Sequence, residues 1–304
     1  MNKKSLSVVI STYNSEKKIE DCIKSASLAD EIIIVDGGST DNTAKIAKKY
    51  NTEVFVRSNN PMLNINKNFG FSKAKSAWIL SLDSDERITP SLHGEIKDKI
   101  SEIRNEISGY YIPRKNIIFD KWIEHTGWYP DYQLRLFKKG KGKFLEEHVH
   151  EMIKVDGQTG YLENNLVHKS YETMHQFMQK AVNIYIPNEA NQLLKKGYKF
   201  DWRDSIRMPL REFASRFFAR EGYKDGLHGL VLSMLMAFYH LLVFGYIWEK
   251  TGFKEIEDKD FLNNVEAELK QSNKDLMFWV EREKLKGINN PVKKTAYKLL
   301  KKLR

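Results

Sequence analysis

The sequence contains little cysteine, little proline and no export signal. Cys22 is its single cysteine, and 7 of its 304 residues are proline. One thiol excludes an intramolecular disulfide framework and fits a reducing compartment. The apolar stretch that begins at Leu6 breaks after about five residues and lacks a small-residue cleavage site, so it predicts a first strand and not a signal peptide. With 41% hydrophobic residues, the chain is expected to be globular and cytoplasmic, with one large domain or two modest ones.

Basic side chains outnumber acidic ones. The chain has 50 Lys and Arg residues against 40 Asp and Glu residues, which gives a formal net charge of +10. Such an excess favours an anionic partner, and nucleic acid, a nucleotide or a phospholipid surface would each satisfy it. Charge alone does not choose among these three classes.

Four short apolar runs occur near the N-terminus, at residues 6–10, 31–35, 53–56 and 77–82. They are continuous and do not alternate with polar residues, which is the pattern of strands that are buried on both faces. Apolar residues with helical spacing lie between them, namely Ile19, Cys22, Ile23 and Ala26, and then Ala44, Ile46, Ala47 and Tyr50. This alternation predicts a mostly parallel α/β sheet, in which a ligand binds beyond the carboxyl ends of the strands.

Polar side chains follow three of these runs. Thr12 and Asn14 come after the first run, Asp36 after the second, and Asp83 and Asp85 after the fourth. We expect them at one edge of the sheet, where Asp36 can accept hydrogen bonds from a base or ribose. An Asp-x-Asp pair in a surface loop is usually solvated, but at the end of a buried strand it favours a Mg²⁺ or Mn²⁺ site. The metal would offset the charge that grows on a departing diphosphate.

Several motifs together resemble one enzyme family. The first set is VVISTYN (8–14), IVDGGSTD (34–41) and LSLDSDE (80–86), and the second is GWYPDYQLRLFKKGKGKF (127–144), HVHE (148–151) and LVHKSY (166–171). The first set resembles glycosyltransferase family 2, the inverting nucleotide-sugar transferases with the GT-A fold. The second set resembles the subgroup of lipopolysaccharide inner-core β-glucosyltransferases. The resemblance covers roughly residues 5 to 171 and implies a Rossmann-like, mostly parallel catalytic domain.

The resemblance also implies a reaction and a set of ligand contacts. The reaction is metal-dependent transfer of a hexose, with glucose and a UDP-sugar as the first expectation, to a lipopolysaccharide core or another glycolipid of the cell envelope. The implied nucleotide contacts are Thr12, Asn14 and Asp36, with Lys67 or Asn68 helping to hold the nucleotide. Asp83 and Asp85 would bind ribose and the metal–diphosphate group, and His168 would complete the metal shell.

Inverting transfer needs a base on the acceptor side of the sugar, and two carboxylates are candidates. Glu151 stands at the family's usual place for the base, although His150-Glu151 replaces the usual Glu-Asp pair. Asp131 is the alternative, and it could instead position the acceptor or Arg135. The base takes the proton of the acceptor hydroxyl while that oxygen attacks the anomeric carbon.

A second region is expected to begin after residue 171, because strand-like runs give way to helical spacing. We therefore predict a catalytic domain at 1–171 and a helical, basic region at 172–304. An apolar stripe over 174–185 predicts a packed helix that Pro187 kinks or ends. Residues 229–248 contain no formally charged side chain and could form a buried core helix, an interfacial helix or a membrane span. We favour an interfacial helix and a peripheral location at the cytoplasmic face of the inner membrane, on an anionic lipid surface.

Two other functions are compatible with parts of the pattern. A metal-dependent nucleotidyltransferase would also use paired aspartates and a basic surface, but it would release pyrophosphate. A non-catalytic module would bind nucleic acid or a membrane surface in a salt-sensitive way. Because candidate nucleotide, metal and base groups are all present, we favour the transferase and expect no nucleic-acid partner.

Overall fold

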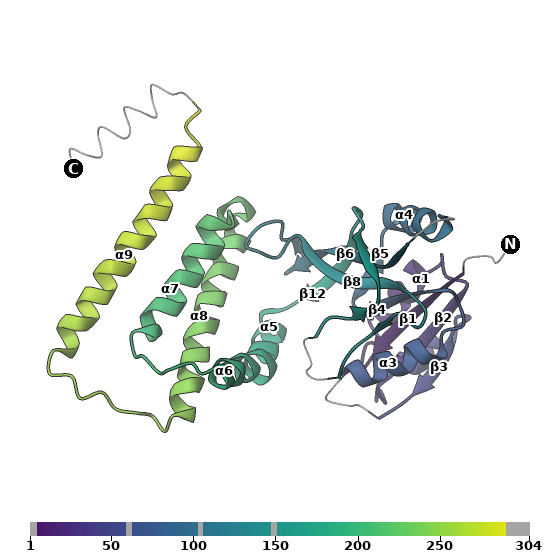
Figure 1. Cartoon of the computed structure of the whole chain (residues 1–304), viewed down its shortest axis with the longest axis horizontal. Coiled ribbons are helices and arrows are strands. Elements are labelled where there is room, and N and C mark those ends of the chain that lie inside the picture. Colours follow the sequence, from purple (N-terminus) through teal and green to yellow (C-terminus); the bar gives the residue numbers. More distant parts are fainter. Residues whose placement is uncertain (1–4, 59–62, 103–105, 147–150, 290–304) are drawn as a thin grey trace. The chain divides into compact units, whose positions relative to one another are not determined.

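The computed structural model describes residues 5–58, 63–102, 106–146 and 151–289. The chain divides into two compact units (Figure 1). The first unit comprises residues 1–122 and 129–170, and the second comprises residues 123–128 and 171–304.

The first unit is built on a mixed β-sheet (Figure 1). Its main strands, in spatial order, are β3 (Glu53–Val56), β2 (Glu31–Asp36), β1 (Leu6–Thr12), β4 (Trp78–Asp83), β8 (Asp131–Lys138), β6 (Ile107–Ile118), β12 (Leu166–Tyr171) and β5 (Glu86–Ile88). The first four are parallel, which confirms the four strands predicted from apolar runs. From β8 onward, antiparallel pairs enter the sheet, so the whole sheet is mixed and not mostly parallel.

Shorter strands complete the sheet around β6. β11 (Gln158–Tyr161) runs parallel to β6, and β7 (Lys121–Trp122) pairs with it in the antiparallel sense. β9 (Gly142–Lys143) and β10 (Lys154–Val155) form a separate antiparallel pair. The hydrophobic runs of β6 and β8 did not stand out in the sequence, because polar residues interrupt both strands near the site.

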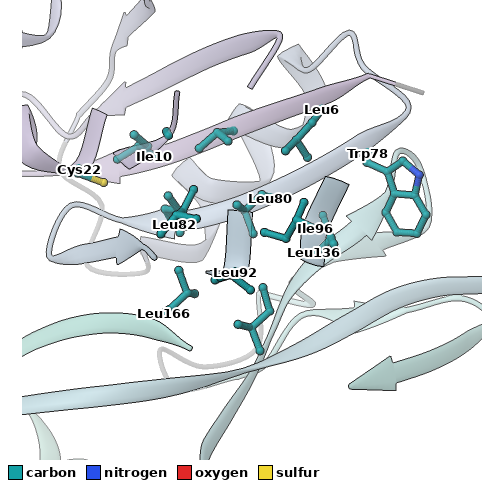
Figure 2. Close-up of a cluster of buried hydrophobic side chains, with 14 of the residues drawn as sticks. Leu6, Ile10, Cys22, Trp78, Leu80, Leu82, Leu92, Ile96, Leu136 and Leu166 are labelled. Carbon is teal, nitrogen blue, oxygen red and sulfur yellow. The ribbon is translucent and has the colours of Figure 1, made fainter. Parts of the chain in front are cut away.

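One face of the parallel strands packs against α1 (Ile19–Ser25) and α4 (Pro90–Ser101). Figure 2 shows this cluster, whose buried members include Leu6, Ile10, Cys22, Leu80, Leu82, Leu92 and Ile96. Each fully buried aliphatic side chain contributes roughly 1.5–3 kcal/mol relative to exposure. Cys22 belongs to this core, and burial raises the pKa of its thiol.

The other face of the sheet packs against α3 (Leu63–Lys73), while the short α2 (Thr43–Ala47) follows β2. Gly70 allows α3 to approach β1 and β2 closely, because a Cβ at this position would lie 2.5 Å from Val9 Cγ1 and 2.8 Å from Val35 Cγ2. Any larger residue at position 70 would force these valine side chains or the helix to shift. This close packing fixes the height of α3 over the strands that carry the site.

The second unit is helical (Figure 1). Its elements are α5 (Met174–Lys180), a π-helical stretch (Ala181–Tyr185), α6 (Ile186–Lys195), α7 (Asp204–Ala214), a second π-helical stretch (Ser215–Ala219), a 3₁₀ turn (Gly222–Asp225), α8 (Leu227–Lys250) and α9 (Phe261–Lys286). Ala181, Ala190, Tyr239, Val243 and Ile247 form its apolar core. Pro187 does not end the helical path, because it falls in the first turn of α6, where its missing N–H is tolerated.

Residues 123–128 reach the second unit from the loop between β7 and β8. The buried carboxylate of Asp225 accepts hydrogen bonds from the backbone N–H groups of Glu124 (3.3 Å) and His125 (2.9 Å). The backbone N–H of Thr126 donates to the carbonyl of Arg220 at 3.1 Å, and Arg216 donates to the carbonyl of Thr126 at 2.8 Å. Both N–H and C=O groups of this segment's backbone therefore form hydrogen bonds with the helical part of the second unit.

Candidate functional site

The predicted polar groups gather at the carboxyl edge of the parallel strands. Thr12 at the end of β1 is in register with Asp36 at the end of β2, and Ser11 is in register with Asp83 at the end of β4. The loop after β1 also meets the loop after β4, since the hydroxyls of Ser15 and Ser84 lie 2.9 Å apart. The common edge expected from the sequence is confirmed.

Asp83 is held between two cations. Its Oδ1 lies 2.6 Å from Lys67 Nζ, and its Oδ2 accepts from an Nη2 of Arg135 at 2.7 Å. The same Nη2 donates to Glu86 Oε1 at 2.7 Å, and Glu86 is fully buried. Burial raises the pKa of the Asp83 carboxyl, but the charges of Lys67 and Arg135 more than offset it and hold that pKa well below its usual range. Asp83 is therefore a fixed carboxylate.

Asp85 faces His168, which the pairing of β12 with β5 brings to this edge. His168 Nε2 lies 3.7 Å from Asp85 Oδ1, and its Nδ1 lies 2.7 Å from Asn116 Oδ1. Asn116 is oriented by its Nδ2, which donates to Asp131 Oδ2 at 3.1 Å. An amide oxygen only accepts, so the Nδ1 of His168 carries a hydrogen and Nε2 is the ring nitrogen that faces Asp85.

This arrangement fits part of a divalent-cation site. The Nε2 of His168 and a carboxylate oxygen of Asp85 lie 3.7 Å apart, a separation that two ligands of one cation would have. Within the described residues no group of three His, Cys, Asp or Glu side chains is gathered for a metal. Asp83, expected as a further ligand, instead directs its oxygens to Lys67 and Arg135. A metal here would take its remaining ligands from a bound diphosphate and water.

Asp131, the first residue of β8, is held in place by Arg114 of β6. Arg114 donates to Asp131 Oδ2 from Nε at 2.9 Å and from Nη2 at 2.6 Å, and Gln133 donates to Oδ1 at 2.9 Å. Burial raises the pKa of Asp131, but the charge of Arg114 and the hydrogen bonds of Asn116 and Gln133 lower it below its usual value. These contacts weaken Asp131 as a base. The expectation that Asp131 positions Arg135 is wrong, because Arg135 donates to Asp83 and Glu86.

Glu151 is attached to α3. Its Oε1 accepts from Asn64 Nδ2 at 3.0 Å and from the backbone N–H of Glu146 at 2.6 Å. Asn68, expected as a nucleotide contact, also binds this loop: its Nδ2 donates to the carbonyl of Phe144 (2.9 Å), and its Oδ1 accepts from the N–H of Phe144 (3.0 Å). Residues 148–150 of the HVHE motif lie outside the described residues.

The three contacts made by α3 come from one side of the helix. Asn64, Lys67 and Asn68 are spaced three and four residues apart, so their side chains are neighbours on the helix surface. Asn64 holds Glu151, Lys67 holds Asp83, and Asn68 holds the loop between them. A single helix face thus positions the candidate base and the candidate diphosphate-side carboxylate relative to one another.

The three expected nucleotide groups after β1 and β2 have different roles in the structure. The hydroxyl of Thr12 is buried and has no hydrogen-bond partner among the described residues. Asn14 joins two loops, because its backbone N–H donates to Ser39 Oγ at 2.8 Å and its Oδ1 accepts from the N–H of Thr40 at 2.9 Å. The buried carboxylate of Asp36 accepts from the N–H (3.1 Å) and hydroxyl of Ser39. Asp36 therefore fixes the conformation of the loop that follows β2.

Four residues of the site were not anticipated from the sequence: Asn64, Glu86, Arg114 and Asn116. A usable signal existed for two of them. In β6, Arg114 and Asn116 stand at alternate positions, which places two polar side chains on one face. The buried charge of Glu86 and the contact of Asn64 depend on strands and loops distant in sequence.

Comparisons with known proteins agree with this geometry. The model of the family described as glycosyl transferase family 2 matches residues 7–159. The lipopolysaccharide core biosynthesis glycosyltransferase LpsC of Rhizobium meliloti is 27% identical over 82% of this chain and 94% of its own length. An uncharacterized glycosyltransferase of Rickettsia typhi is 29% identical over 79% of this chain and 85% of its own length.

Among solved structures, residues 1–349 of Staphylococcus aureus TarS in complex with UDP align with 84% of this chain and 93% of that one, with 16% identity and a TM-score of 0.42. The family assignment does not depend on this structural likeness. It rests on the family model, which spans half of the chain and includes the three motifs that end β1, β2 and β4. The chain belongs to glycosyltransferase family 2 and is a glycosyltransferase.

Proposed function

We propose that this chain transfers a hexose, with glucose the first candidate, from a UDP-sugar to a lipopolysaccharide core or a similar glycolipid, with inversion at the anomeric carbon. The family membership supports transfer from an activated sugar, and the likeness to LpsC supports the acceptor class. The observation that carries the proposal is the side of α3 that holds Glu151 through Asn64 and Asp83 through Lys67. Inverting transfer needs a base and a leaving-group site that are held in fixed positions relative to one another.

Glu151 is the proposed base. Its carboxylate takes the proton of the acceptor hydroxyl as that oxygen attacks the anomeric carbon, while the bond to the diphosphate breaks on the opposite side. Asn64 and the N–H of Glu146 orient the carboxylate for this transfer. Asp131, which Arg114 keeps ionised and occupied, is assigned to positioning the acceptor side of the site.

Asp83, Asp85 and His168 form the diphosphate end of the proposed site. Asp83 stays ionised and would accept hydrogen bonds from the ribose, while Thr12 offers its unpartnered buried hydroxyl to the nucleotide. Asp85 and His168 would hold Mg²⁺ or Mn²⁺. When bound, such a cation offsets the negative charge on the leaving diphosphate.

The helical unit is the proposed membrane-binding part. Among the described residues, α8 is the one helix whose length and hydropathy would let it cross a membrane, and 33% of its most apolar window is buried. A glycolipid acceptor lies in a membrane, so a peripheral location at the cytoplasmic face of the inner membrane would bring enzyme and acceptor together.

The reaction is tested by measuring nucleoside diphosphate release from a panel of sugar nucleotides with Mn²⁺ or Mg²⁺ and a membrane extract as the acceptor source. We expect one preferred donor, and a loss of roughly 10²–10⁴-fold in kcat for Glu151→Gln. Asp85→Ala should lose metal-dependent turnover. Glu163→Gln, an exposed glutamate of the same unit, is the matched control and should behave as the parent.

Two outcomes would contradict the proposal. Release of pyrophosphate in place of a nucleoside diphosphate would favour a nucleotidyltransferase. Parent-like turnover by Glu151→Gln, with a loss in Asp131→Asn, would move the base to Asp131.

A further inference from the structure

Three tyrosines on neighbouring strands form an exposed aromatic cluster in the first unit. Tyr161 of β11 stacks on Tyr111 of β6, with ring centroids 5.0 Å apart and an interplanar angle of 18°. Tyr132 of β8 meets Tyr161 edge to face, at 5.0 Å and 86°. Tyr161 is 62% exposed and Tyr132 is 38% exposed. We call these three residues the tyrosine platform.

Packing does not account for the platform. A tyrosine contributes to a core by burying its ring, but Tyr161 leaves most of its surface in water. Among the described residues, no hydrogen bond is formed by the hydroxyls of Tyr132 and Tyr161, and no lysine or arginine stacks on their rings. The cluster therefore presents a rigid aromatic face and two hydroxyls that the fold itself does not use.

The platform lies on the sheet face that also carries the Glu151 loop. Tyr111 packs against the cluster that includes Phe144 and Ile153, which flank Glu151 in the chain. Tyr132 is the second residue of β8, at the end of that strand that lies toward the site edge, and its side chain points to the opposite face of the sheet from that of Asp131. The platform therefore shares a sheet face with the segments that flank Glu151, the proposed base.

We propose that the tyrosine platform binds a pyranose ring of the acceptor saccharide, next to the sugar whose hydroxyl is attacked. Pyranose rings have an apolar C–H face that matches the negative face of an aromatic ring, and hydroxyl edges that match the two tyrosine hydroxyls. A flat, rigid pair of rings orders few torsions on binding, so it supplies contact area at low entropic cost. The inference rests on the proposed function, because it assigns the acceptor of the same site.

The test is direct binding without a donor, measured by isothermal titration calorimetry. The probes are a delipidated lipopolysaccharide core oligosaccharide, cellotetraose and chitotetraose. We expect the parent to bind at least one probe and Tyr161→Ala to bind it roughly tenfold more weakly. Tyr161→Phe should keep most of the affinity, because it keeps the ring, whereas Tyr161→Leu should not. Affinity for UDP, measured on the same samples, should be unchanged in all three variants and reports that each is folded.

The control is Phe278→Ala in α9, where an aromatic ring of similar exposure (61%) is removed from the other unit. The platform proposal is overturned if no probe binds the parent, or if Tyr161→Ala and Tyr161→Leu bind as tightly as the parent. The two proposals fail separately. Tyr161-dependent oligosaccharide binding without turnover of any donor would leave the platform standing and remove the transferase reaction.

Discussion

At the scale of single residues, each carboxylate of the site is fixed by a different partner, and the partner decides its role. Lys67 and Arg135 form ion pairs with Asp83. His168 faces Asp85, and Arg114 donates two hydrogen bonds to Asp131. Glu151 accepts hydrogen bonds from the side-chain amide of Asn64 and from the backbone N–H of Glu146. Arg114 helps to lower the pKa of Asp131, which makes Asp131 the weaker candidate base and supports our proposal of Glu151.

The hydrogen bonds from Asp131 through Asn116 to His168 predict an effect on metal binding. Asn116→Leu removes the acceptor that fixes the tautomer of His168, so affinity for Mn²⁺ in the presence of UDP should fall roughly 10–100-fold. Electron paramagnetic resonance of free Mn²⁺ measures this affinity without turnover. Lys115→Leu, at the neighbouring position and stacked on Trp122, is the control. Unchanged Mn²⁺ affinity in Asn116→Leu would show that this chain of hydrogen bonds does not orient a metal ligand.

At the scale of elements, the sequence predicts what depends on local pattern. The parallel strands were predictable because each is a continuous apolar run, and the positions of Asp36, Asp83 and Asp85 follow from strand ends. The role of α3 was not predictable, because Asn64 contacts a residue 87 positions away in the chain. The family resemblance implied a nucleotide contact for Asn68, and its bond to Phe144, 76 positions away, was not predictable for the same reason.

The helical unit contains an ion cluster that makes its stability depend on pH. Glu212 of α7 lies 3.7 Å from His240 Nε2 of α8 and accepts from Arg216. Burial raises the pKa of Glu212, but its bonds to His240 and Arg216 bring the value down to about 2. A depressed carboxyl pKa stabilises the fold above the unfolded value near 4.5, and this contribution is lost as pH falls toward 2.

Glu212→Gln should therefore lower the free energy of unfolding at pH 7 by at most about 3 kcal/mol, and the difference from the parent should shrink as pH falls below 4.5. Urea unfolding at pH 7, 5 and 3 measures it. Glu249→Gln, an exposed glutamate of α8, should show no such trend. A difference between Glu212→Gln and the parent that stays constant from pH 7 to pH 3 would contradict the assignment.

At the scale of the whole molecule, the chain passes between the two units at three places. Two of these passages stand next to site residues: Trp128 precedes Asp131 by three positions, and Tyr171 follows His168 by three. The change in composition near residue 171 was visible in the sequence. The assignment of residues 123–128 to the helical unit was not, because it depends on Asp225, about a hundred positions further along.

α8 has two unlike faces, although its sequence is apolar all round. Leu232, Val243 and Ile247 are fully buried within the helical unit. Met234, Phe238, Leu241 and Trp248 recur at helical spacing and are 58%, 46%, 40% and 39% exposed. If the helical unit binds a membrane surface as proposed, this exposed face is the candidate lipid contact.

The exposed apolar face of α8 predicts how strongly the chain binds to lipid vesicles. Replacing Met234 and Phe238 by serine removes two exposed apolar side chains without touching the core of the unit, so binding to vesicles with anionic lipid should weaken roughly tenfold or more. Cosedimentation with such vesicles measures binding, and raised salt should weaken the parent's binding because part of it is electrostatic. Val56→Ser, at a 60% exposed valine of β3, is the control. Parent-like binding by the double variant would exclude this face as the lipid contact, and resistance of the parent to extraction from native membranes by alkaline carbonate would favour a spanning helix.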